Sequence, residues 1–151
     1  MKKFVWVIIV AVVFLSLGFY LVTYGNKSSE KININYGISL STDKMSYSIG
    51  ETINMALKVF NYTEEGVVFY FNTSQRYDFI IEGEEAKEVW RWSKDRMFAM
   101  GLGEEVLGAT NTDVIYTEKY NDKLSPGYYK ITGILVTKNR PMSGSIIIEV
   151  K

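Results

Sequence analysis

The 151-residue chain contains no cysteine and no histidine, and it has only two prolines. Without histidine it lacks the commonest general base and the commonest metal ligand, which excludes Ser-His-Asp and Cys-His catalysis. Without cysteine there is no disulfide framework, so burial of apolar side chains must hold the fold. The 17 basic and 17 acidic residues give a formal net charge of zero, with no basic stripe. Nucleic acid is therefore a poor candidate partner.

The residues that remain offer no convincing catalytic set. A Ser-x-x-Lys spacing occurs at residues 41–44, but it lies at a predicted strand-to-turn boundary and not at the start of a helix. An acidic cluster surrounds a predicted turn and consists of Glu82, Glu84, Glu85 and Glu88. At such a place we expect a solvated loop, and neither an acid–base pair nor a calcium site. The sequence therefore predicts a protein that is not an enzyme and has no cofactor and no metal site.

One long apolar run, FVWVIIVAVVFLSLGFYLV, occupies residues 4–22 directly after Lys2 and Lys3. It matches the ~20 residues that a helix needs to cross a membrane, and it is apolar all round, unlike the helix of a soluble fold. We therefore predict a transmembrane signal anchor over residues 1–25 and a polar linker over residues 26–31. A cleaved signal peptide is the alternative, but its best cleavage site, residues 16–18, would leave four apolar residues on the new terminus.

The orientation of this anchor rests on its short basic tail. Lysines lie on both sides of the apolar run, at Lys2 and Lys3 and at Lys27 and Lys31, so their number does not decide the topology. A very short basic N-terminal tail usually stays inside. We therefore expect a single-pass protein of the cell membrane with its C-terminal domain outside the cytoplasm.

From residue 32 onward, apolar residues alternate with polar or small ones, which predicts strands with one buried face. The pattern occurs over residues 32–40, 45–49, 53–59 and 77–81, and further strands are expected at 67–71, 89–92, 114–118, 128–136 and 146–150. Residues 67–71 (VVFYF) fit either a central strand or a strand with an aromatic outer face. The glycine-containing segment 97–108 is expected to be a long loop. Eight or nine short antiparallel strands over residues 32–151 predict a β-sandwich or barrel.

Two motifs stand out in the folded part. The sequence LSPGYY at residues 124–129 is typical of the tyrosine corner of immunoglobulin-like domains, with Tyr129 as its tyrosine. The sequence WRWS at residues 90–93 places Trp90 and Trp92 on one face of a strand and Arg91 on the other. Two interpretations remain open for the tryptophans: a core face, or an aromatic binding patch with an arginine beside it.

The stretches FNTSQRYDF (residues 71–79), EVWRWS (residues 88–93) and residues 95–98 resemble the BsuPI family of intracellular proteinase inhibitors. The resemblance extends over residues 43–136. It implies an immunoglobulin-like β-sandwich and an inhibitor of a serine protease. The family-motif residues, which are also candidate protein contacts, are Gln75, Tyr77, Asp78, Trp90, Arg91, Trp92, Ser93 and Phe98.

Together these patterns predict a membrane-anchored, extracytoplasmic domain that binds a protein and, by resemblance, inhibits a proteinase. The candidate exposed loop for a substrate-like inhibitor contains Arg96, Met97, Ala99 and Met100. The alternative is a surface structural or adhesion module without inhibitory activity. We also expect Gln75 and Asp78 to bond the backbone where one strand leads into the next, with the tryptophans packed over that connection, which would make the motif architectural.

Overall fold

The computed structural model describes residues 35–110 and 112–151. The predicted anchor (residues 1–25) and linker (residues 26–31) lie outside these residues, as do the first residues of the first predicted strand. Across the described part of the chain, none of the helical structure is long and apolar enough to cross a membrane.

The described residues form an all-β domain with ten strands and one 3-10 turn, η1 (Glu84–Ala86). The strands are β1 (Tyr36–Thr42), β2 (Ser46–Tyr47), β3 (Ile53–Asn61), β4 (Val67–Thr73), β5 (Tyr77–Glu82), β6 (Glu88–Arg91), β7 (Met100–Leu107), β8 (Thr112–Tyr120), β9 (Gly127–Leu135) and β10 (Met142–Val150). All nine strands expected from the sequence are present. The one strand that we did not expect, β7, lies in the segment that was predicted to be a loop.

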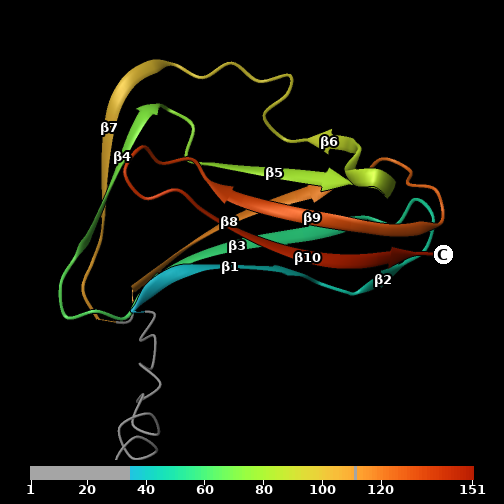
Figure 1. The fold of residues 1–151 in the computed structure, drawn as a ribbon, viewed down its shortest axis with the longest axis horizontal. Coiled ribbons are helices and arrows are strands. Elements are labelled where there is room, and N and C mark those ends of the chain that lie inside the picture. The colour runs from blue at the N-terminus through green and yellow to red at the C-terminus, as the bar shows by residue number, and fades with distance from the viewer. Residues whose placement is uncertain (1–34, 111) are drawn as a thin grey trace, which may run out of the picture. The chain divides into compact units, whose positions relative to one another are not determined.

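The strands form a three-stranded sheet β1-β3-β8, a five-stranded sheet β2-β10-β9-β5-β6 and the separate pair β4-β7 (Figure 1). Every pairing is antiparallel except that of β2 with β10, which is parallel, so the expectation of a purely antiparallel sandwich is wrong there. The reason lies in the path of the first strand. After β1 pairs with β3, the chain bends at residues 43–45 and β2 joins the opposite sheet beside the last strand.

The core lies between the two larger sheets. Strand β3 alternates between buried and half-buried positions along its whole length, as period-two patterning predicts. Its inward side chains meet those of the other sheet in a cluster that includes Ile53, Met55, Leu57, Phe79, Ile81, Ile131 and Ile148. The sheets approach so closely at Gly133 that a Cβ there would lie 2.6 Å from Cδ1 of Leu57. This position therefore requires glycine.

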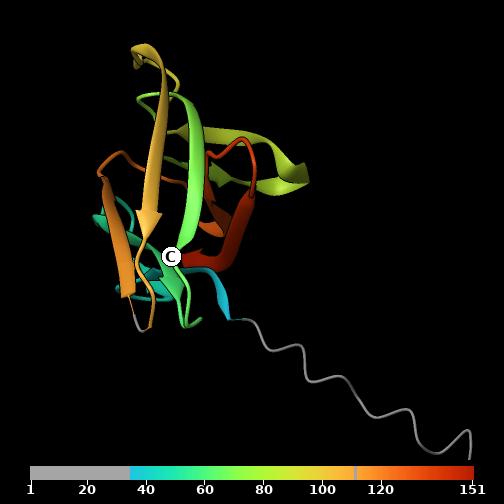
Figure 2. The ribbon, with the colours of Figure 1, turned by 90° about the vertical axis from the view of Figure 1, so that its left-hand side faces the viewer.

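The β4-β7 pair runs across the direction of the other strands (Figures 1 and 2). Val67, Phe69 and Phe71 of β4 and Leu107 of β7 form a second core cluster, which also includes Val59 of β3 and Leu135 of β9. Since Tyr70 is exposed and β4 has only β7 as a neighbour, residues 67–71 form a strand with an aromatic outer face and not a central strand.

The predicted loop over residues 97–108 is wrong, because residues 100–107 pair with β4. Leu107 is the single buried residue of β7. The sequence of β7 therefore lacks the alternating apolar residues that predict a half-buried strand. The extended backbone of β7 is stabilised by hydrogen bonding to a strand that is distant in the sequence, from Val67 opposite Leu107 to Thr73 opposite Met100.

The tyrosine corner is present. The Tyr129 hydroxyl at the start of β9 donates a hydrogen bond to the carbonyl oxygen of Ser125 at 2.9 Å. This bond ties the turn after β8 to the following strand, as in immunoglobulin-like sandwiches.

Candidate functional site

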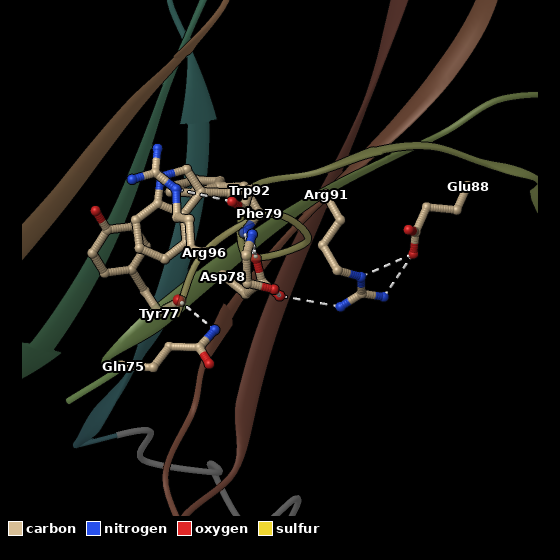
Figure 3. A network of polar contacts seen from close by, with 9 residues as sticks. Gln75, Tyr77, Asp78, Phe79, Glu88, Arg91, Trp92 and Arg96 are labelled. Carbon is tan, nitrogen blue, oxygen red and sulfur yellow. Dashed lines mark hydrogen bonds and ion pairs between the residues drawn. The ribbon is translucent and has the colours of Figure 1, made fainter. Parts of the chain in front are cut away.

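The centre of the motif region is Asp78 on β5, whose side chain is 4% exposed. Its Oδ1 accepts hydrogen bonds from the backbone amides of Phe79 (2.9 Å) and Ser93 (3.1 Å). Its Oδ2 accepts from Ser93 Oγ (2.7 Å) and from Arg91 Nη1 (3.1 Å), the latter drawn in Figure 3. Four donors thus compensate for the burial of one carboxylate. Asp78 therefore joins β5 to the end of β6.

Arg91 extends this network to the protein surface. Its Nε and Nη2 both contact Oε2 of Glu88, at 2.9 and 2.8 Å, while Nη1 holds Asp78 (Figure 3). The hydrogen bond that Arg91 donates to Glu88, and to a smaller extent the one that it donates to Asp78, raises the pKa of the guanidinium. Because the carboxylates of Glu88 and Asp78 already accept hydrogen bonds from its guanidinium, Arg91 stabilises the junction between β5 and β6.

Gln75 lies where the chain turns from β4 into β5. Its Nε2 donates to the carbonyl oxygen of Tyr77 at 3.1 Å (Figure 3), and its backbone amide donates to Oγ1 of Thr73 at 3.2 Å. Gln75 and Asp78 thus both bind backbone at strand connections. This geometry agrees with the architectural interpretation of the two residues.

An aromatic stack lies next to this polar network. The Tyr77 ring is 4.5 Å from Trp92 and 4.7 Å from Tyr116, measured between ring centroids. The Tyr77 hydroxyl donates to Glu118 at 2.6 Å, and burial raises the pKa of Tyr77 above its usual range. Trp90 meets Tyr120 edge to face at 5.4 Å. Both tryptophans are partly buried against the core, as expected for a core face.

The chain then crosses from β6 to β7 through residues 92–99, which we call the β6–β7 loop. The Arg96 guanidinium lies 4.3 Å from the centroid of the Trp92 ring, and its Nε donates to the Trp92 carbonyl oxygen at 3.0 Å (Figure 3). The Phe98 ring contacts the same indole at 5.7 Å between centroids. Trp92 is thus a platform on which two loop residues rest.

The far end of the loop is fixed to the β4–β5 turn. The amide of Ala99 donates to Oγ of Ser74 at 3.0 Å, and the amide of Ser74 donates to the Ala99 carbonyl oxygen at 2.9 Å. Between these anchors the Met97 side chain is 98% exposed.

The predicted site residues therefore fall into two groups. Seven of the eight motif residues lie on β5, on β6 or in the connections next to them, whereas the eighth, Phe98, lies in the β6–β7 loop with Arg96, Met97 and Ala99. Met100 was expected in that loop but is the first residue of β7, and its side chain is 87% exposed. The prediction missed Ser74 and Tyr116. Ser74 is inside the FNTSQRYDF stretch and could have been included, whereas nothing in the local sequence connects Tyr116 on β8 with Tyr77.

The described residues contain no group of three or more acidic side chains placed to hold a metal ion. The glutamates near η1 surround a turn, and Glu84 and Glu85 are exposed. Within this turn the backbone adopts positive φ angles at Glu85 and Ala86, whereas Gly83 is extended. What the motif region offers is a fixed surface loop over a satisfied polar network.

Solved structures that resemble this chain do so at low sequence identity. The sporulation control protein Spo0M from Bacillus subtilis superposes with a TM-score of 0.50 at 11% identity, covering 78% of this chain and 49% of the Spo0M chain. The CARDB domain of a Pyrococcus furiosus protein has a TM-score of 0.45 at 11% identity, covering 77% of this chain and 87% of that domain. No curated protein matches the chain in sequence.

A family model covers most of the folded part. It matches residues 40–140, which include the β5–β6 junction and the β6–β7 loop, and its description is "intracellular proteinase inhibitor". The chain belongs to the BsuPI family of intracellular proteinase inhibitors.

Proposed function

We propose that this protein is a membrane-anchored proteinase inhibitor that contacts its target through the β6–β7 loop. One observation carries the proposal: Met97 is almost fully exposed, while the residues on both sides of it are held by Trp92 and Ser74. Family membership supports the choice of a protease as the partner.

The order of the β6–β7 loop affects binding through the conformational entropy of its residues. An inhibitor that binds like a substrate gains affinity when its loop is already ordered, because little conformational freedom is lost on binding. Disulfides and prolines often supply that order, but the β6–β7 loop contains neither. Here Arg96 and Phe98 rest on Trp92, and two hydrogen bonds join Ala99 to Ser74. These contacts replace a covalent clamp.

The proposal places the domain outside the cytoplasm and its target protease in the same compartment. The uncharged run at residues 4–22, with its short basic tail, supports an anchor of this orientation. Membrane fractionation of the full chain, followed by protease treatment of intact cells, tests this part. Recovery of the chain in the aqueous fraction would contradict the anchor, and full protection in intact cells would contradict the orientation.

The test of inhibition uses the full chain in detergent micelles against subtilisin, chymotrypsin, elastase and trypsin. We expect at least one of these serine proteases to be slowed at micromolar inhibitor, with the β6–β7 loop intact after prolonged incubation. Rapid cleavage within residues 93–99, or no slowing of any of the four enzymes, would contradict the proposal.

The alternative function, a surface structural or adhesion module, has one observation in its favour. Strand β7 exposes Met100, Leu102 and Val106, and exposed apolar side chains that lie close together often mark a protein contact. If this alternative holds, Leu102→Asp should abolish recovery of a stable membrane partner without changing inhibition. A partner recovered equally well with this variant would count against the alternative.

A further inference from the structure

We propose that Met97 is the specificity residue of the β6–β7 loop and enters the primary specificity pocket of the target. The target is then a serine protease with a deep, uncharged, apolar pocket, of the chymotrypsin or subtilisin type. This inference rests on the function proposed above and adds the class of enzyme that the loop recognises.

First, the side chains of residues 96–99 differ in whether they rest on another part of the protein. Arg96 is turned back over Trp92, and its Nε is bonded to the Trp92 carbonyl oxygen. Phe98 is partly buried against the same ring. Ala99 has no more than a methyl group to offer. Arg96 is exposed but rests on the Trp92 ring, whereas Met97 is 98% exposed. Met97 is therefore the long side chain of residues 96–99 that is best placed to enter a pocket.

The second step concerns the backbone around Met97. Positive φ angles among the described non-glycine residues occur at Glu85, Ala86 and Thr110, so no loop residue adopts a left-handed conformation. No backbone hydrogen bond within the described residues occupies the amide or carbonyl groups of Met97 and Phe98. These groups are free to pair with an extended segment of a protease cleft, as a substrate strand does.

The third step is the chemistry of the pocket. Methionine is long, unbranched and uncharged, and its flexible thioether fills irregular apolar pockets. A pocket with a carboxylate at its base selects lysine or arginine, and the one arginine among residues 96–99 is already engaged by Trp92. Lys94 is also exposed, but it lies in the turn at residues 92–95 that begins the loop. The side chain that residues 96–99 present thus fits an apolar pocket and not a charged one.

The experiment compares the full chain in micelles with Met97→Lys and with a matched control, Met100→Lys. Met100 is nearly as exposed as Met97 but belongs to β7. We expect the wild type to inhibit chymotrypsin or subtilisin at least about tenfold better than trypsin, the scale on which specificity pockets discriminate side chains. Met97→Lys should reverse this preference by weakening inhibition of the first two enzymes about tenfold or more and strengthening inhibition of trypsin. Met100→Lys should leave the preference unchanged.

The outcomes separate this inference from the proposed function. If the wild type inhibits a protease but Met97→Lys leaves the preference unchanged, or if Met100→Lys reverses it, the inference is wrong and the inhibitor function stands. If the wild type slows none of the four proteases, both proposals fail. The thermal midpoint of Met97→Lys should equal that of the wild type, because a side chain so exposed contributes little to packing.

Discussion

Two adjacent stretches of the family motif differ in where they direct their side chains. Around residues 75–93, the carboxylate of Asp78 points inward and accepts four hydrogen bonds at 4% exposure, while the buried indole Nε1 of Trp92 has no hydrogen-bond partner among the described residues. In the β6–β7 loop that follows, the large apolar side chain of Met97 is exposed. Asp78 is thus buried and Met97 exposed, which for each of these two residues is the reverse of what hydrophobicity alone would give. We infer that the first stretch is a scaffold and the second is a displayed segment.

The comparison assigns different roles to residues that are neighbours in the sequence. A scaffold residue should affect binding through the stability or order of the fold, whereas a displayed residue should affect binding at constant stability. Measuring the free energy of unfolding and the inhibition constant on the same variants therefore tests the division.

The largest effect is expected at the scaffold, for Asp78→Ala. Removing the carboxylate leaves Ser93 Oγ, two amides and part of Arg91 without their acceptor, which should lower the free energy of unfolding by ~3 kcal/mol. Urea denaturation measures the loss. Asp78→Asn is the matched control, because its oxygen can still accept from the amides, so it should lose about half as much. Equal stability of Asp78→Ala and the wild type would remove the scaffold interpretation.

The next effect separates the two tryptophans. Trp92→Leu and Trp90→Leu should each cost ~2 kcal/mol, because each removes a large, partly buried ring. Only the Trp92 variant should also weaken inhibition beyond its effect on stability, since Arg96 and Phe98 rest on that ring. Chemical denaturation and inhibition assays below the unfolding transition measure both. If the two variants inhibit equally well, the platform role of Trp92 is wrong.

A smaller effect is expected at the far anchor of the loop. Ser74→Ala removes the hydroxyl that accepts from the Ala99 amide, which should lower stability by ~1 kcal/mol or less. Because the loop loses one anchor, inhibition should weaken several-fold and cleavage within residues 93–99 should accelerate. Ser145→Ala, an exposed change on β10, serves as the control. An unchanged cleavage rate for Ser74→Ala would argue that Trp92 alone orders the loop.

The smallest effect appears only at alkaline pH, in the aromatic stack of the scaffold. Burial raises the pKa of Tyr116 to about 12, and it also raises that of Tyr77, whereas an unfolded tyrosine titrates near ~10. The stability contributed by the neutral phenols is complete below pH ~10 and is lost as the pH rises toward the folded pKa. Thermal midpoints should therefore fall between about pH 10 and 12, and less steeply in Tyr116→Phe. Identical slopes for the two proteins would contradict the raised pKa.

Much of the fold follows from local pattern. The alternation of Ile53, Met55, Leu57 and Val59 predicted the buried face of β3, and the LSPGYY stretch predicted the bond from Tyr129. These features depend on neighbours within one strand or one turn, where side-chain period and turn chemistry act directly. The candidate loop was identified only in part, because the predicted loop over residues 97–108 also contained strand β7.

Other features had no local signal. Strand β7 was taken for a loop, since its glycines and exposed side chains hide a strand that is stabilised by pairing with β4. Asn61 is fully buried, and its amide nitrogen donates to three backbone carbonyls, those of Glu65, Leu107 and Gly108. Two of these acceptors lie at the end of β7, so the role of Asn61 depends on a contact distant in sequence.

The sequence by itself determined that this protein is a β-sandwich without histidine or cysteine chemistry, because period-two burial and the residue composition are properties of the chain alone. The tertiary structure decided which motif residues form the scaffold and which are displayed. Asp78 has a structural role because Ser93, just after β6, donates a hydrogen bond to its carboxylate. Met97 is displayed because Trp92 and Ser74 bind the residues on either side of it. Such assignments depend on which distant groups meet, and only the packed chain specifies that.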